Sequence, residues 1–387
     1  MLAEVRSPEV IASNLDIILQ KAEQDQYRSI LFPQIDLSLT YGRSAFIRRN
    51  EIPSNYRASP TLRWSIFRYF EVQKARETFL SAENARTLQL KFTKKQNHIQ
   101  VIDLYLDWLG TEILVEKLTT SKTSTGKKLE RLELLKNGST APNSIQELQS
   151  QLNGINRSLN IANAQLFTTE GLLAKMCGLK NLKQVERPTF KDFNFSPTPL
   201  KNYIAESLVK SEGIESSELL SFVASKEEDK ERIARFSKIS IYASLTDILS
   251  NLSSNILTIS WAYELIDQGN FNRKILKARA NILLADLEVA EQHKNIYQLA
   301  GNVWISLLDA TADFNEIKNT RQQQQINFDV VSGQLSTGYI DPFHVWQTRS
   351  ALKIDKYEEK IAYLEMARAI SHYETLTSGE ITRWNIR

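Results

Sequence analysis

The feature of this sequence that most constrains its fold is a long internal repeat. Gly138 is followed four residues later by Pro142, and two hundred positions further along Gly338 is followed in the same way by Pro342. Other pairs keep an offset of 197 to 201 residues, as diverged copies with small gaps do: Trp64 with Trp261, Tyr105 with Trp304, and Gly178 with Gly379. The repeat predicts two copies of one structural unit, over residues 1–198 and 199–387.

Each copy contains a long segment without proline, from Glu71 to Lys136 and from Phe271 to Ile340. A helix of about 65 residues would be about 100 Å long, which implies coiled packing rather than a globular core. In the second copy, apolar residues follow alternating steps of four and three. They are Leu276, Ala280, Leu283, Leu287, Ala290, Tyr297, Trp304 and Leu308. The Gly-x-x-x-Pro elements then turn the chain, so each copy predicts an antiparallel helical hairpin with its tip near residue 138 or 338.

Short segments of strict apolar–polar alternation precede each long helix. They predict strands at about 34–41 and 61–70 in the first copy, and at about 237–246 and 255–264 in the second. The polar link from Gly42 to Ala58 predicts a solvated loop. Each copy is therefore expected to combine a β-hairpin with a helical hairpin, an α+β unit.

The strands allow two interpretations. They are either two hairpins on a soluble core or membrane strands, and their identical placement in two repeats favours the membrane. Four strands cannot close a membrane barrel, and an open sheet edge in lipid leaves backbone groups unpaired. Three copies would supply twelve strands, and cyclic symmetry would extend the same ring into the helices.

Composition excludes several classes. The 48 basic and 45 acidic residues give a net charge of +3, too balanced for a nucleic-acid partner. The four histidines (His98, His293, His344 and His372) are widely separated, and no phosphate loop or catalytic triad has informative spacing, so we expect no metal, no cofactor, no catalytic residue and no enzyme. No apolar run is long enough for a transmembrane helix. Residues 1–6 lack a signal-peptide pattern, which favours either a cytoplasmic protein or a chain whose signal was removed.

Three segments resemble the TolC-like outer-membrane efflux proteins, and the resemblance covers nearly the whole chain. Ser7–Val10 leading to Leu31–Ile35 resembles the family's opening helix and first strand. Ile259–Trp261 through Asp267–Gly269 resembles the end of its fourth strand, and Ser336–Ile340 its second hairpin tip. Each motif is short, but their order, spacing and duplication together are specific.

The resemblance implies a homotrimer with a twelve-stranded barrel in the outer membrane and an α-helical tunnel in the periplasm. It implies export of small molecules or an unfolded protein, received from an inner-membrane pump (ABC, RND or MFS type) through a periplasmic adaptor. Two alternatives stay open. One is a soluble coiled-coil scaffold, and the other is the adaptor of such a machine, although an adaptor should have only one hairpin.

The resemblance also assigns sites. The adaptor-docking tips are Asn137, Gly138, Ser139, Thr337, Gly338 and Tyr339, although both glycines also suit simple helix caps. At the pore entrance, the positions that are often acidic in the family fall on His344 and Gln347, so this chain departs from that pattern. Asp341 is a further candidate, but its position before Pro342 favours a helix N-cap instead. If His344 lines the constriction, its charge changes near neutral pH.

The strand alternation predicts which positions face lipid. The eight lipid-facing barrel positions are Leu37, Leu39, Leu62, Trp64, Ile239, Ile241, Ile259 and Trp261. A charged run over residues 226–232 predicts a solvated helix face without a function of its own.

Overall fold

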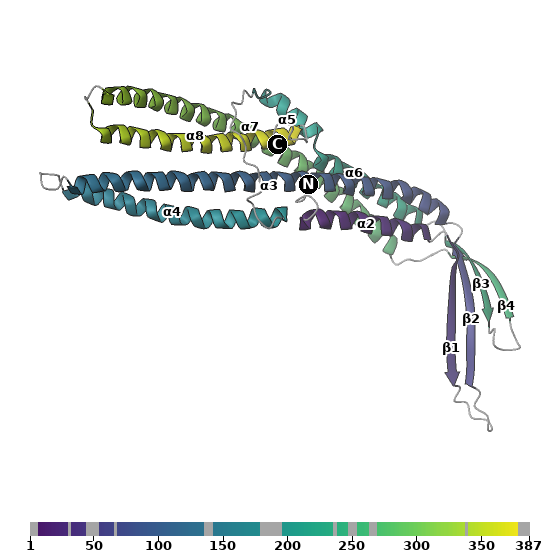
Figure 1. Ribbon diagram of the computed structural model, residues 1–387. Helices are drawn as coiled ribbons and strands as arrows, with labels where there is room; N and C mark the ends of the chain where they lie inside the picture. Colours follow the sequence, from purple (N-terminus) through teal and green to yellow (C-terminus); the bar gives the residue numbers. More distant parts are fainter. Residues whose placement is uncertain are drawn as a thin grey trace. The chain divides into compact units, whose positions relative to one another are not determined.

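The computed structural model describes residues 7–29, 32–43, 54–65, 68–134, 142–178, 196–234, 238–246, 254–262, 269–336 and 340–377. Its elements are, in order, α2 (Pro8–Ser29), β1 (Gln34–Arg43), β2 (Ser54–Ser65), α3 (Arg68–Leu134), α4 (Pro142–Cys177), α5 (Leu200–Val209), α6 (Glu212–Ala234), β3 (Lys238–Thr246), β4 (Ser254–Ala262), α7 (Asn270–Ser336) and α8 (Pro342–Thr377). The repeat is visible in the helices, because α3 and α7 both have 67 residues and α4 and α8 both have 36. Both long helical hairpins are therefore present (Figure 1).

The chain packs as two compact units that do not coincide with the two repeats. Unit 1 comprises Met1–Ile11, Thr93–Ser211 and Asn295–Arg387, and unit 2 comprises Ala12–Phe92 and Glu212–Lys294. Each unit takes segments from both repeats. The physical reason lies in the strands, since a two-stranded hairpin is marginal alone and the two hairpins join into one sheet.

The sheet of unit 2 has four antiparallel strands in the order β1-β2-β3-β4. The two hairpins meet between β2 and β3, where Trp64 pairs with Ile241. The strand boundaries correct two expectations. β1 and β2 extend into the predicted loop, pairing Arg43 with Ser54, and β2 ends at Ser65 rather than near residue 70, because α3 begins at Arg68. Backbone pairing continues along these polar residues, since side-chain alternation marks only the half-buried part of a strand.

The helices of unit 2 form a row in the same order as the strands. Lys21 of α2 pairs with Glu83 of α3 at 3.3 Å, and Ser216 of α6 donates a hydrogen bond of 2.9 Å to the Ala85 carbonyl of α3. On the other side of α6, Ser221 donates to Asp286 of α7 at 2.6 Å. The row is therefore α2–α3–α6–α7.

One residue of the charged run in α6 does more than face solvent. The Glu228 side chain is only 16% exposed, and it accepts hydrogen bonds from Arg232 and from Arg279 of α7. These bonds hold the pKa of Glu228 below its ordinary value. The run is helical as expected, but Glu228 fastens α6 to α7.

Unit 1 contains the two helical hairpins and two apolar clusters. One cluster joins α3 to Leu173 of α4 and Leu364 of α8. The other joins α7 to α8 and to Tyr203 of α5, which stacks on Tyr373 with ring centroids 4.1 Å apart. The row of helices in this unit is therefore α4–α3–α8–α7, with α5 covering the junction of α7 and α8.

Candidate functional site

Asp341 lies at the start of α8 and caps it. Its Oδ1 accepts a hydrogen bond of 3.1 Å from the backbone N–H of Phe343, and its carbonyl accepts one of 2.9 Å from His344. These bonds satisfy backbone donors that the first turn of a helix leaves free. The N-cap interpretation of Asp341 is confirmed.

The same carboxylate links the two hairpins near their tips. Asp341 ion-pairs with Arg131, in the last turn of α3, and the Arg131 guanidinium lies 4.1 Å from the ring centroid of Phe343. Lys127 lies 5.0 Å from the ring of Trp346, which stacks on Phe343. We call these five residues (Lys127, Arg131, Asp341, Phe343 and Trp346) the tip clasp.

The clasp fixes the charge state of Asp341. The hydrogen bond from Arg131, followed by that from the Phe343 N–H, holds the pKa of Asp341 below its ordinary value. The carboxylate therefore stays ionised at neutral pH, with an arginine beside it. Asp341 is therefore paired with a cation in this chain, and its place at the pore entrance stays a prediction.

The other predicted entrance residues lie nearby but outside the clasp. His344 is exposed and Gln347 is half-buried, both in the first two turns of α8. The six tip positions (Asn137, Gly138, Ser139, Thr337, Gly338 and Tyr339) lie outside the described residues, so their docking role stays a prediction.

A second polar link between α3 and α8 lies further from the tips. Arg368 pairs with Asp107 and lies 3.6 Å from Asp103, and Nε2 of His372 lies 2.8 Å from Oδ1 of Asp103. Sequence analysis missed this cluster. Its members come from helices about 260 residues apart along the chain, and no local spacing marks them.

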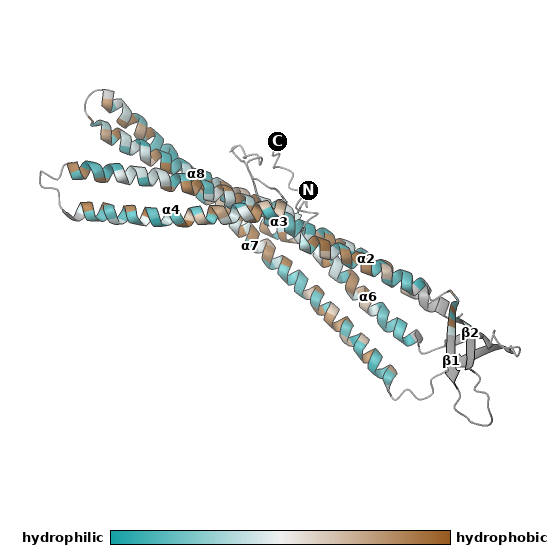
Figure 2. Cartoon of the chain, turned by 60° about the horizontal axis from the view of Figure 1, so that its bottom comes forward, coloured by the Kyte–Doolittle hydropathy of each residue, from teal (hydrophilic) through white to brown (hydrophobic). Residues whose placement is uncertain are grey.

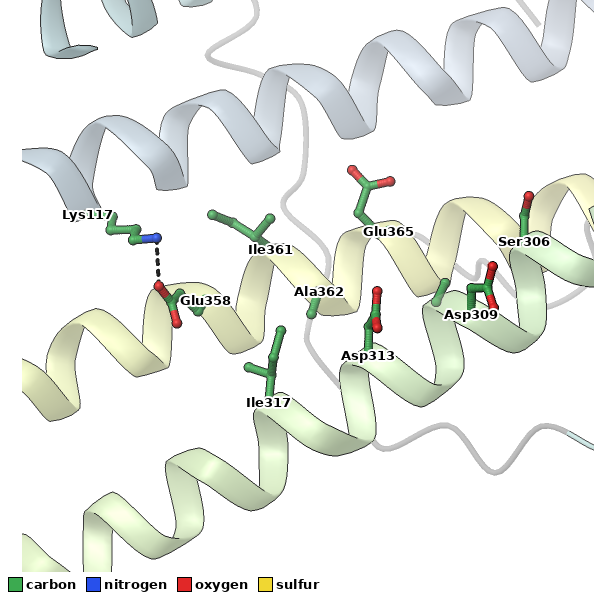
Figure 3. A pocket seen from close by; sticks show the side chains of 10 residues that line it. Lys117, Ser306, Asp309, Asp313, Ile317, Glu358, Ile361, Ala362 and Glu365 are labelled. Atoms are coloured by element: carbon green, nitrogen blue, oxygen red, sulfur yellow. Dashed lines mark ion pairs between the residues drawn. The ribbon is translucent and has the colours of Figure 1, made fainter. Parts of the chain in front are cut away.

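A hollow of about 590 Å³ lies between α3, α7 and α8 (Figure 3). Glu358 on its wall pairs with Lys117 at 2.8 Å. The carboxylates of Asp309, Asp313 and Glu365 also line the hollow, and Ile317 contributes an apolar part of its wall. Among the described residues, no group of three His, Cys, Asp or Glu side chains is placed to hold a metal ion, and we assign this hollow no ligand.

In unit 2, the predicted heptad stripe of α7 is exposed, whereas its member Trp304, in unit 1, donates a hydrogen bond of 3.0 Å to the Thr198 carbonyl and packs on the α7–α8 cluster. Leu276, Leu283 and Leu287 are 64–66% exposed, and Ala280 and Ala290 of the same stripe are also exposed. The residues that α7 buries against its own chain in unit 2 belong to a neighbouring stripe, which includes Ile275 and Ala278. Apolar residues recur along α7 in Figure 2. Among the described residues, the unit 2 part of this heptad pattern therefore lies open in a single chain.

Two other helices also expose apolar side chains. In α2, Leu15, Ile18 and Leu19 are 53–61% exposed. In α4, Phe167 is 82% exposed. These helices stand at the opposite ends of the helix rows from α7, α2 in unit 2 and α4 in unit 1. In each row, both outermost helices therefore expose apolar side chains.

The sheet register sorts the strand positions into two faces. Directly paired residues of antiparallel strands belong to one face. The pairs Ile35–Leu62, Trp64–Ile241 and Ile239–Trp261 therefore place all eight predicted lipid-facing positions on a single face. The positions between them, such as Asp36, Arg63, Ser240 and Ser260, belong to the other face. That lipid covers this apolar face stays a prediction.

Compared by sequence, the chain matches no family model and no curated protein. Compared by structure, it matches the outer-membrane channel OprN (12% identity, TM-score 0.74), over 98% of this chain and 88% of OprN. The Campylobacter jejuni CmeC outer membrane channel matches with 12% identity and a TM-score of 0.75, over 98% of this chain and 84% of CmeC. The outer membrane protein VceC of Vibrio cholerae matches with 12% identity and a TM-score of 0.73, over 97% of this chain and 94% of VceC.

At this level of identity, the likeness establishes the fold. The chain has the fold of these outer-membrane channels along nearly its full length, and the resemblance to TolC-like proteins is confirmed for the fold. Among the helices that the structure describes, none is both long and apolar enough to cross a membrane.

Proposed function

We propose that the chain is one subunit of an outer-membrane channel-tunnel, in which three copies close a twelve-stranded barrel and continue it as a helical tunnel. The observation that carries the proposal is the open construction of unit 2. Among the described residues, its sheet has four strands, an apolar face and no further strand at either edge, and the helices at the two ends of its row expose leucine side chains. An unpaired edge within a bilayer would leave backbone groups without partners, so the edges must be closed by other copies.

The proposed number of copies is argued from the number of strands that a barrel needs and from the fold. Single-chain bacterial barrels have at least about eight strands, so a four-stranded subunit needs at least two copies. Cyclic symmetry allows any number, because each copy offers two different edges and the contact is head-to-tail. The resemblance to TolC-like proteins favours three.

The proposed role is transport without chemistry. The chain supplies a conduit for small molecules or an unfolded protein, and an inner-membrane pump supplies the energy through a periplasmic adaptor that meets the hairpin tips. The tip clasp supports a controlled entrance at that end. It holds the start of α8 against the last turns of α3, so the second hairpin cannot move away from the first without separating Arg131 from Asp341.

The experiment is expression behind a known export signal, followed by membrane fractionation and measurement of the native mass in detergent. The expected result is a detergent-dependent trimer in the outer-membrane fraction. A soluble monomer or dimer would instead mean that the strands do not span a bilayer, and the coiled-coil scaffold interpretation would replace the channel.

A further inference from the structure

The polar face of the unit 2 sheet has more basic than acidic positions. The strand register assigns every second residue of each strand to this face, and most of its neutral positions are serines and threonines. Among the described strand residues, its charged positions are three basic ones and one acidic one, namely Arg57, Arg63 and Lys238 against Asp36. The described part of this face therefore has a net charge of two positive units in each copy.

The three basic positions are spread along the strands. Lys238 is the first residue of β3, and Arg63 of β2 pairs with Tyr242, four residues further along β3. Arg57 follows in the same direction, six residues from Arg63 on β2. At about 3.3 Å per residue the three positions span about 33 Å, which is close to the thickness of a bilayer core. A solute that moves along the strands would therefore pass basic residues at three levels.

The acidic position lies beside the middle basic one. The register places Asp36 of β1 diagonally opposite Arg63 of β2. Such diagonal positions are about 7–8 Å apart, within reach of long side chains. Asp36 therefore offsets the charge of Arg63 first, and the positions of Arg57 and Lys238, further along the strands on either side, keep the face positive.

We infer that the proposed barrel passes anions in preference to cations, which makes anionic solutes the favoured class of cargo. This inference rests on the proposed function, because the polar face lines a lumen only if copies close a ring with their apolar faces toward lipid. Three copies would then bring six net positive charges to the lumen. Arginine and lysine side chains that line a pore select for anions. In water, a unit charge about 10 Å away changes the local concentration of an ion by about twofold.

Carboxylates at the proposed entrance would oppose this preference, and the start of α8 adds no net negative charge. The Asp341 carboxylate is ion-paired with Arg131. Residues 342–349, the first two turns of α8, contain no aspartate or glutamate, and Arg349 adds a further positive charge. The charges at the start of α8 are therefore compatible with an anionic cargo.

The test is the reversal potential of the purified oligomer in a planar bilayer of neutral lipid, under a tenfold KCl gradient. The wild-type chain is expected to be more permeable to chloride than to potassium by at least about twofold. The variant Arg57→Ser/Arg63→Ser/Lys238→Ser leaves a net negative charge on the described part of the face. Its chloride-to-potassium permeability ratio should therefore fall below that of the wild type and below unity.

Two further variants separate the charge of this face from general effects of substitution. Arg43→Ser is the matched control, because Arg43 pairs with Ser54 on the apolar face, and it should leave the permeability ratio unchanged. Asp36→Asn changes one charge in the opposite direction and should raise the ratio by about twofold. This single variant keeps the inference testable if the triple variant does not insert.

A conducting channel can still overturn the inference. Cation preference in the wild type would mean that carboxylates elsewhere, such as Asp309 and Asp313, control permeation. The same ratio in the wild type, the triple variant and Asp36→Asn would mean that the polar face does not line the conducting path. Both results would leave a membrane channel and reject only the anion preference. An oligomer that never conducts would reject the proposed function together with the inference.

Discussion

The two long helices, α3 and α7, correspond in the repeat and have equal length, yet they differ in what covers them. The large apolar side chains that α3 exposes among its described residues are Leu80, at 45%, and Leu134 in its last turn. α7 exposes such side chains along most of its length, from Leu276 to Val330. α3 packs between two helices in each unit, whereas α7 packs on α6 in unit 2 and on α8 and α5 in unit 1. One duplicated helix became an interior member of the row, and the other became an edge.

This difference shows how the two copies of a tandem repeat acquire different surroundings within one chain. Duplication alone produces two equivalent hairpins, but placing them side by side gives each a different outer neighbour. The exposed stripe of α7 in unit 2 then lies open to a further copy in the proposed ring, whereas α3 has a helix of its own chain on both sides.

The largest expected effect follows from a charge in the exposed stripe of α7. Leu283→Asp should prevent assembly, because burying one leucine contributes about 1.5–3 kcal/mol and a carboxylate buried without a partner carries a further penalty. This corresponds to association at least about tenfold weaker. Native mass in detergent measures it, with circular dichroism to confirm that the helices remain. Leu80→Asp in α3 is the matched control and should retain the oligomer. Equal loss of the oligomer in both variants would contradict the distinction between α7 as an edge helix and α3 as an interior helix.

The next effect concerns the two repeat-related tryptophans, Trp64 on interior strand β2 and Trp261 on edge strand β4. If both face lipid, Trp64→Asp and Trp261→Asp should each impair insertion, since a charge on a lipid face costs up to about 2–4 kcal/mol. Ser260→Asp, on the other face of β4, should have little effect. The yield of trimer in the outer-membrane fraction measures all three. Normal insertion of both tryptophan variants would reject the lipid-facing placement.

A smaller effect is expected at the two repeat-related glycines of the tips. Gly338→Trp and Gly138→Trp should each reduce export more than assembly, because a bulky side chain would obstruct docking of an adaptor. Dye accumulation in cells that lack their own outer-membrane channel measures export, and the trimer yield measures assembly. Full export by both variants, or failure of both to assemble, would remove the docking argument.

The smallest effect concerns the start of the second helix in each hairpin. Asp341 precedes Pro342 in α8, whereas Ala141 occupies the equivalent position before Pro142 in α4. Asp341→Ala should speed amide hydrogen exchange in the first turn of α8, because the cap and the ion pair with Arg131 are both lost. Glu133→Ala, in the last turn of α3, is the control. Unchanged exchange in Asp341→Ala would mean that the clasp does not hold α8.

The pH dependence of this contact has a definite sign. The pKa of Asp341 is lowered in the folded chain, so its contribution is fully present above the ordinary pKa of an aspartate, about 3.9. The contribution is lost as the pH falls through the lowered value. Exchange in the first turn of α8 should therefore stay constant from neutral pH down to about 4, once corrected for the intrinsic rate, and rise only below that range.

Much of the fold could be predicted from the sequence because its signals are local. The proline-free segments predicted the two long helices, and the Asp-Pro pair at residues 341–342 predicted a helix cap. The alternation of apolar and polar residues along the four strands predicted eight lipid-facing positions. The strand register then placed all eight on one face of the sheet. Boundaries were less predictable. The polar residues Arg43 and Ser54 pair in the sheet although nothing in their side chains marks them as strand.

The contacts between distant segments could not be predicted in this way. Arg131 meets Asp341 across 210 positions, and His372 meets Asp103 across 269. Nothing in the neighbouring residues indicates either partner, because a charged side chain on a long helix has the same sequence context whether it pairs or faces water.

The sequence by itself determined the duplicated architecture, since helix length, hairpin tips and strand alternation follow from backbone preferences and periodicity over short windows. Only the tertiary structure decided which of the duplicated helices stands at the edge. Leu276 and Ile275 are adjacent apolar residues of one helix, and both fit a heptad pattern. Which of them is buried depends on where α6 lies, and that position is fixed when β2 pairs with β3 to join the two hairpins into one sheet.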